Sequence, residues 1–267
     1  MADDFTRPDD LKLALEAALA GAAEGLRHFA ALAGLPRELK ADGSVVTAAD
    51  RAVEDRIREV LAGARPGDAI LGEEHGETLG TEGRRWIIDP IDGTLLFVEG
   101  DDRWLVLIAL EDHGEITVGV AAVPAQNRIW WAVRGGGTWE AEVLDGRIAG
   151  ERRIRVAGGD SPDLADSRLG VVPDWGRGQV TALIEAADEH DWAIQPALLV
   201  ARGDLDVAVQ TSGQIWDFAA TSLIVTEAGG DYRGLDGRTT PGPGASLYSR
   251  SARLGAAALA VLRPGGL

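Results

Sequence analysis

Two aspartates three residues apart follow an apolar stretch a third of the way along the chain. Residues 86–94 read Trp-Ile-Ile-Asp-Pro-Ile-Asp-Gly-Thr. Carboxylates such as Asp89 and Asp92 are costly to remove from water unless a cation or hydrogen-bond donors balance them. Gly93 and Thr94 stand where a helix could begin, with N–H groups that have no partner inside the helix. The segment therefore predicts a phosphate and a divalent metal at one site. The alternative is a turn in which Asp92 caps the next helix.

Two further acidic positions strengthen the metal interpretation. Glu73 follows the apolar segment 69–71, and Asp217 stands at the expected start of a helix. Each has a structural alternative, as a solvated loop residue and as a helix N-cap respectively. Together with Asp89 and Asp92 they supply about the four carboxylates, from separate segments, that neighbouring Mg²⁺ ions would need.

A fifth acid, Asp50, lies three residues after Thr47. A threonine followed three residues later by an acid is typical of a capping box at a helix start. That role needs no active site, but it is compatible with one. Asp50 is therefore a candidate both for capping and for catalysis.

The pattern of apolar residues predicts elements able to position these side chains. Helical spacing predicts helices over residues 9–33 and 48–62. Short β-type segments follow at 69–71, 86–88, 104–111, 116–123, 128–133 and 138–143, with a hairpin turn at 135–137. In the second half we expect strands at 168–172 and 204–209 and helices at 177–190, 216–228 and 252–262. This order predicts a mixed α/β fold with subdomains over residues 1–150 and 151–267.

Composition excludes several classes of protein. The 267 residues carry 26 Lys and Arg against 43 Asp and Glu, a net charge of −17, and contain no cysteine. Disulfides, thiolate nucleophiles and iron–sulfur clusters are thereby excluded. The negative charge disfavours nucleic acid and anionic membranes as partners. Because no apolar run could span a bilayer and the N-terminus lacks a basic signal-peptide region, we expect a cytoplasmic protein.

The acidic segments occur in an order that resembles one known family. The pieces are Asp50, Glu73-Glu74, Asp89 to Thr94, Trp216-Asp217 and, after eleven residues, Gly229-Gly230. They resemble the inositol monophosphatase superfamily, whose members are Mg²⁺-dependent, lithium-sensitive phosphomonoesterases. The resemblance implies an alternating αβαβα layered fold of the inositol monophosphatase and fructose-1,6-bisphosphatase type. It also implies two to three Mg²⁺ ions, with Mn²⁺ as a substitute, and a homodimer.

The resemblance also implies residue roles. The first metal would be bound by Glu73, Asp89 and the carbonyl of Ile91, and the second by Asp89, Asp92 and Asp217. Glu73 would touch a third metal or its water, and with Thr94, polarised by Asp50, would activate the attacking water. The phosphate and substrate contacts would come from Asp92, Gly93, Thr94, Gln210 and Asp217.

The substrate expected from the resemblance is a small phosphorylated metabolite. Stretches such as Arg65 to Gly76 and Arg128 to Trp131 resemble the actinobacterial-type histidinol-phosphatase branch most. Departures from the family pattern around the alcohol-binding region are Leu95, Leu96, Glu99, Gln210 and residues 192–196. An inositol-1-monophosphatase, or a phosphatase of another sugar or nucleotide-like ester, therefore stays open beside histidinol-phosphate phosphatase. A non-catalytic metal or phosphate sensor with the same fold is the alternative of another class.

Overall fold

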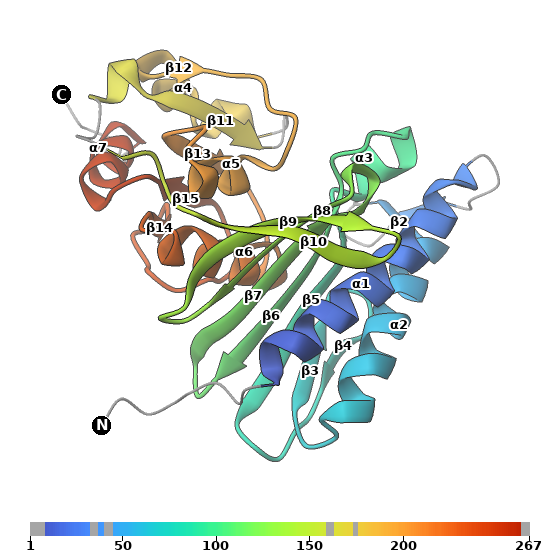
Figure 1. Cartoon of the computed structure of the whole chain (residues 1–267). Coiled ribbons are helices and arrows are strands. Elements are labelled where there is room, and N and C mark those ends of the chain that lie inside the picture. Colours follow the sequence, from blue (N-terminus) through green and yellow to red (C-terminus); the bar gives the residue numbers. More distant parts are fainter. Residues whose placement is uncertain (1–8, 33–36, 40–44, 159–162, 173–175, 263–267) are drawn as a thin grey trace. The chain divides into compact units, whose positions relative to one another are not determined.

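The computed structural model describes residues 9–32, 37–39, 45–158, 163–172 and 176–262 (Figure 1). The chain divides into two compact units. The first comprises residues 1–134 and 139–152, and the second comprises residues 135–138 and 153–267. Each unit contains helices and a sheet, which confirms the predicted mixed α/β class.

The first unit is built on an eight-stranded sheet. Its helices are α1 (Asp10–Phe29), α2 (Ala48–Ala64) and α3 (Thr94–Glu99). Its strands are β1 (Arg37–Leu39), β2 (Val45–Thr47), β3 (Ala69–Gly72), β4 (Gly76–Thr78), β5 (Arg84–Asp92), β6 (Leu105–Asp112), β7 (Glu115–Val123), β8 (Arg128–Val133), β9 (Gly137–Leu144) and β10 (Arg147–Ile154). The sheet order is β10-β9-β8-β7-β6-β5-β3-β4, and β1 and β2 form a separate pair.

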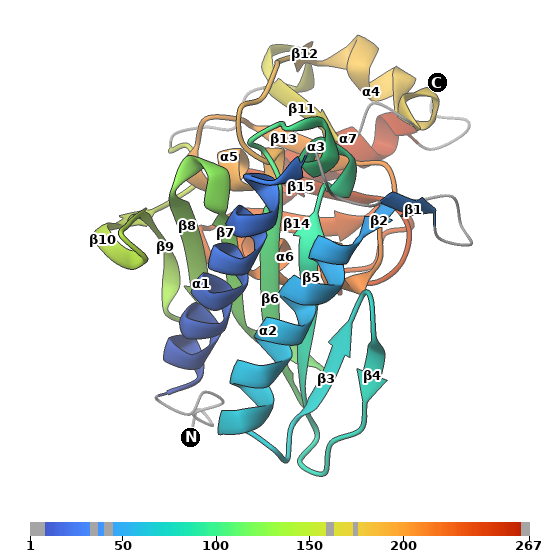
Figure 2. The same cartoon turned by 90° about the vertical axis from the view of Figure 1, so that its right-hand side faces the viewer.

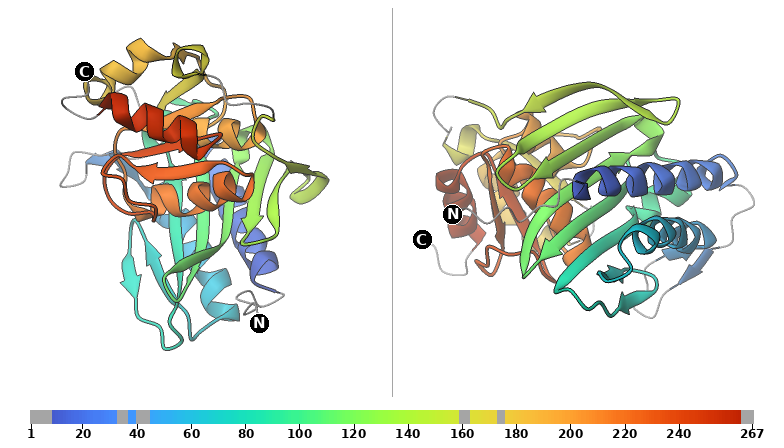
Figure 3. Two further views of the ribbon diagram at one scale, coloured as in Figure 1. Left: turned by 90° about the vertical axis from the view of Figure 1, so that its left-hand side faces the viewer. Right: turned by 60° about the horizontal axis from the view of Figure 1, so that its bottom comes forward.

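Helices α1 and α2 lie side by side on this sheet (Figures 2 and 3). They pack against β5, β6 and β7 and confirm the helices predicted over 9–33 and 48–62, although α1 already ends at Phe29. The inward stripe of α2 includes the fully buried Val53, Ile57 and Leu61. No helix in the described part of the chain is both long and apolar enough to cross a membrane.

The start of α2 is fixed by the capping box that the sequence predicts. The Thr47 hydroxyl accepts the Ala49 N–H at 3.0 Å, and Asp50 Oδ2 accepts the Thr47 N–H at 2.8 Å. These two bonds satisfy backbone donors that a helix start leaves without intrahelical partners. Asp50 is thereby held at a defined position beside the sheet.

Strand β5 carries an irregularity at its carboxyl end. Asp89 is opposite Leu107 of β6 and Asp92 is opposite Leu105, so the two residues between the aspartates on β5 stand against the single Val106 on β6. In a regular strand, residues three apart point to opposite faces. The extra residue of a bulge reverses this alternation, so that both aspartates can face the same side. The bulge also accommodates Pro90, which cannot donate to the ladder.

The second unit contains a five-stranded sheet with helices packed on it (Figure 3). Its strands, in the order β12-β11-β13-β15-β14, are β12 (Asp188–Glu189), β11 (Arg168–Val172), β13 (Val207–Gln210), β15 (Ser246–Ser249) and β14 (Asp231–Gly234). Its helices are α4 (Thr181–Ala186), α5 (Pro196–Arg202), α6 (Ile215–Glu227) and α7 (Ala252–Leu262). Helices α5 and α6 pack together, and so do α4 and α7. The turn at 135–137 is held in this unit by Glu227, which accepts the N–H groups of Gly135 and Gly137.

Several predicted elements of this unit are confirmed, and one helix is wrong. The strand at 168–172 and the helix at 252–262 form with the predicted bounds. Of the predicted helix 177–190 only 181–186 is α-helical. Asp188 and Glu189 pair in parallel with the start of β11, so the strand ladder ends the helix early. Helix α5 was not predicted, because its run Ala-Leu-Leu-Val-Ala is buried all round and has no periodicity.

Candidate active site

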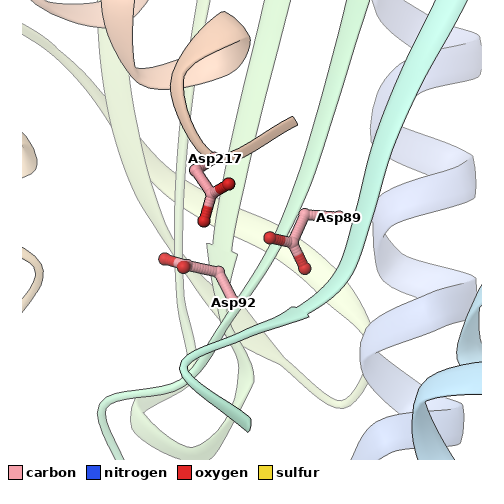
Figure 4. Close-up of side chains that lie close together, drawn as sticks. All are labelled: Asp89, Asp92 and Asp217. Atoms are coloured by element: carbon pink, nitrogen blue, oxygen red, sulfur yellow. The ribbon is translucent and has the colours of Figure 1, made fainter. Parts of the chain in front are cut away.

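Asp89 and Asp92 come together at the bulged end of β5. Their carboxylates each offer an oxygen within 4.8 Å of the other, and Asp89 is almost fully buried. Figure 4 draws both side chains, together with Asp217. An all-oxygen donor set suits a hard divalent cation such as Mg²⁺. Gly93, and not Asp92, occupies the N-cap of α3, so the purely structural interpretation of Asp92 as that cap is wrong.

Gly93 and α3 follow directly after these carboxylates. Gly93 has a φ of +83°, in the left-handed region where glycine is favoured. The six-residue helix is anchored through Phe97, whose ring centroid lies 5.0 Å from that of Trp104 and 5.3 Å from that of Phe29. This aromatic cluster fixes where Thr94, the first residue of α3, is presented.

The side chains of Thr94 and Asp50 are hydrogen bonded. The Thr94 hydroxyl lies 3.1 Å from Asp50 Oδ1 and 3.1 Å from the Ile91 carbonyl. A hydroxyl has one proton to donate, and its lone pairs remain able to accept from a third group. Burial raises the pKa of Asp50, and the bonds from Thr47 and Thr94 offset part of that rise. The pair can therefore orient a water molecule through the oxygen of Thr94.

Glu73 lies at the end of the strand next to Asp89. Strands β3 and β5 are parallel, with Gly72 opposite Ile88, and the Glu73 N–H donates to the Ile88 carbonyl at 3.3 Å. The two acids therefore follow neighbouring parallel strands at the same edge of the sheet. The Glu73 side chain is partly exposed and does not belong to the close carboxylate group found among the described residues.

Sequence reasoning missed a buried acid close to Glu73. Glu54 of α2 is fully buried, and its carboxylate accepts the N–H groups of Glu74 and His75. A signal was present, because Glu54 falls on the helical stripe formed by Asp50, Ile57 and other inward residues. A charged residue on an apolar face has to be paired or hydrogen bonded.

The second unit contributes Asp217 and Gln210. Asp217 is the third residue of α6 and accepts the N–H of Gln214 at 2.6 Å, so it completes a capping box and is not itself the N-cap. Gln210 ends β13, is nearly buried, and accepts a hydrogen bond from Gln195 Nε2 at 3.3 Å. Gln195, which lies in the segment 192–196 that departs from the family pattern, also caps α5 by accepting the Ala197 N–H.

Comparison with known proteins identifies what this arrangement resembles. The sequence model described as the inositol monophosphatase family matches residues 9–263. A histidinol-phosphatase of Mycobacterium tuberculosis is 39% identical over 90% of this chain and 92% of its own length. An inositol-1-monophosphatase of Mesorhizobium japonicum is 35% identical over 85% of this chain and 86% of its own. The crystal structure of extragenic suppressor protein suhB from Bartonella henselae is 28% identical, covers 95% of this chain and 98% of its own, and has a TM-score of 0.81.

Proposed function

The chain belongs to the inositol monophosphatase family and is a phosphoric monoester hydrolase, and we propose that its substrate is histidinol phosphate. The observation that carries the hydrolytic chemistry is the carboxylate pair Asp89 and Asp92, brought together by the bulge beside the Thr94–Asp50 pair. The substrate is supported by the histidinol-phosphatase of M. tuberculosis, which is similar over nine tenths of this chain.

We propose that the site takes two to three Mg²⁺ ions, with Mn²⁺ as a substitute. Asp89 would serve two of them, with Glu73 and the Ile91 carbonyl on one side and Asp92 and Asp217 on the other. Asp217, the third residue of α6, would complete the second set of ligands. When bound, such ions lower the pKa of water, neutralise phosphate oxygens and stabilise the leaving alkoxide.

The chain's own groups would then orient the reaction. Thr94 Oγ1 donates its proton toward Asp50 and so can accept a hydrogen bond from the attacking water, whose proton Glu73 would take. The backbone N–H groups of Gly93 and Thr94 would hold the phosphate. Attack in line with the leaving alcohol then needs no covalent intermediate, in keeping with a chain that has no cysteine.

The alcohol side of the site is where the substrate would be selected. Histidinol phosphate carries a cationic amine, which an acidic surrounding favours. Gln210 and Leu95 do not carry the charge that would do this, so we propose that Glu99, at the end of α3, contributes it. Inositol phosphates, sugar phosphates and nucleotides lack an amine of this kind on the alcohol.

A substrate panel tests the proposal. Phosphate release should be measured with Mg²⁺ from histidinol phosphate, inositol 1-phosphate, a sugar phosphate and a nucleotide, and we expect the highest kcat/KM for histidinol phosphate. A clear preference for inositol 1-phosphate would refute the proposed substrate. Metal binding without hydrolysis of any ester would instead favour a sensor.

Three further features are proposed from family membership. We expect inhibition by lithium, a homodimer and a cytoplasmic location. Phosphate release in the presence of LiCl, sedimentation velocity and cell fractionation would check them in turn.

A further inference from the structure

We propose that Glu54 is a positioning residue that holds the turn carrying Glu73 in the geometry needed for metal binding and water activation. This inference rests on the proposed function, because it gives Glu73 a role there. Glu54 would contact neither substrate nor metal. It would act through the backbone on both sides of Glu73.

The carboxylate of Glu54 is bonded to the residues directly after Glu73. Its Oε2 accepts the Glu74 N–H at 2.7 Å, and its Oε1 accepts the His75 N–H at 3.2 Å. The side chain of Glu54 has no exposed area. Hydrogen bonds from N–H groups to a buried carboxylate are short, strong and directional, so they fix the turn from its carboxyl side.

Glu73 is also held from its amino side. Its own N–H donates to the Ile88 carbonyl at 3.3 Å. The preceding residue, Gly72, lies against Glu54, since a Cβ on Gly72 would be only 2.1 Å from Glu54 Oε1 and 2.4 Å from Cδ. A residue other than glycine would force this carboxylate away from the turn. Glu73 therefore stands between two backbone segments that are each held in place.

The buried charge of Glu54 is balanced by one arginine. Arg58 Nε donates to Glu54 Oε1 at 2.7 Å from one turn further along α2. The same guanidinium donates to the carbonyl of Gly76, beyond the turn. A buried carboxylate is tolerated when it has a charged partner and satisfied hydrogen bonds. Glu54 and Arg58 thus bind the backbone on the carboxyl side of Glu73, Glu54 through the N–H groups of Glu74 and His75 and Arg58 through the Gly76 carbonyl.

An amide cannot replace this carboxylate. In Glu54→Gln one of the two terminal atoms becomes an NH₂ group, which only donates. If the NH₂ group faces Glu74, two donors meet and the bond from the Glu74 N–H is lost. If the amide is flipped, the NH₂ group meets the His75 N–H and Arg58 Nε, and both of those bonds are lost. Either orientation breaks at least one bond to the turn while the side-chain volume is almost unchanged.

The test compares Glu54→Gln with Glu73→Gln and with the double variant. Metal affinity should be measured both as the Mg²⁺ concentration for half-maximal phosphate release and, without substrate, as Mn²⁺ binding by water-proton relaxation. Loss of a group that orients a metal ligand typically costs about 10–100-fold in affinity or activity. We expect Glu54→Gln to weaken both measures by roughly tenfold or more. In the Glu73→Gln background the same change should have little further effect, because the ligand that Glu54 positions is already gone.

Two control variants separate positioning from general destabilisation. Glu140→Gln changes another buried glutamate of the first unit, which is bonded to Trp130, Arg128 and Arg152. Asp55→Asn removes an exposed carboxylate next to Glu54 in sequence, whose Oδ1 lies 3.0 Å from the His75 Nε2. Both should keep the wild-type metal dependence, and thermal unfolding without metal should show that all the variants are folded.

These measurements separate the positioning role of Glu54 from the proposed phosphatase function. If wild-type protein neither binds Mn²⁺ nor releases phosphate, the proposed function fails. If Glu73→Gln loses metal affinity but Glu54→Gln binds as the wild type does, the positioning role is refuted and the function stands. Equal effects of Glu54→Gln and Glu140→Gln on metal affinity would also refute it, since they would mark a response to destabilisation alone.

Discussion

The hydroxyl of Thr94 lies 3.1 Å from Oδ1 of Asp50, a residue whose other carboxylate oxygen caps α2. One side chain therefore joins the start of α2 to the start of α3. The structural and the catalytic interpretations of Asp50 are compatible in this geometry, because each uses a different oxygen.

Stability should depend on pH through Asp50. Burial raises its pKa above the ordinary 3.8, so the folded protein binds the proton more tightly than the unfolded chain does. The resulting stabilisation is present below the ordinary pKa and is lost as pH rises through the raised value. The free energy of unfolding of the wild type minus that of Asp50→Asn should therefore fall as pH rises above the ordinary value of 3.8. Urea unfolding at several pH values would measure it, and a difference that grows with pH would contradict the assignment.

Asp92→Asn should abolish phosphate release while leaving the fold intact. The amide removes one negative charge from the pair that Asp92 makes with Asp89, and with it the strongest reason for a divalent cation to bind. Asp102→Asn, at an exposed position bonded to Gln126, is the control and should keep full activity. Near-normal Mg²⁺-dependent turnover by Asp92→Asn would show that the role given to Asp92 is wrong.

Gly93→Ala should lower both stability and kcat. An alanine at a φ of +83° costs about 1–2 kcal/mol, and its Cβ would press against Leu96 Cδ1 at 3.3 Å. Gly100→Ala is a matched control at the other end of α3, with a φ of +79° and its nearest contact at 3.8 Å. Denaturant unfolding should show similar losses for the two variants, whereas kcat should fall for Gly93→Ala alone. A comparable fall in both would remove Gly93 from the phosphate-binding group.

Gln210→Glu should favour substrates that carry an amine. A carboxylate at this position can still accept the hydrogen bond from Gln195 Nε2, so the local contact is retained. We expect a lower KM for histidinol phosphate and an unchanged or higher KM for inositol 1-phosphate. Equal changes for both esters would place Gln210 away from the alcohol.

The sequence was informative where one local signal set one element. The Thr47–Asp50 box started α2 as predicted, and two apolar segments on either side of the turn residues 112–115 gave the hairpin of β6 and β7. It was uninformative where contacts distant in sequence decided the outcome. Pairing of Asp188 with Arg168 shortened a predicted helix.

The candidate site shows the same division. The segment from Asp89 to Asp92 alone left a metal site and a helix cap both open, and only the bulge in β5 explains how residues three apart can share a face. Glu54 falls on the inward stripe of α2, but its contact with the turn after Glu73 could not be predicted, because the backbone N–H groups that it accepts lie 20 and 21 residues away and carry no side-chain signature.

Asp50 and Glu54 are one helical turn apart on the inward stripe of α2. One reaches Thr94, and the other reaches the turn after Glu73. Helix α2 therefore holds two parts of the candidate site, and a displacement of the helix would disturb both the Asp50–Thr94 contact and the turn after Glu73. Gly21 of α1 allows α2 to pack closely against α1, since a Cβ at this position would come within 2.8 Å of the Ile57 side chain. A bulkier residue at position 21 would therefore displace α2 and lower activity, although Gly21 is not one of the residues proposed to take part in the reaction.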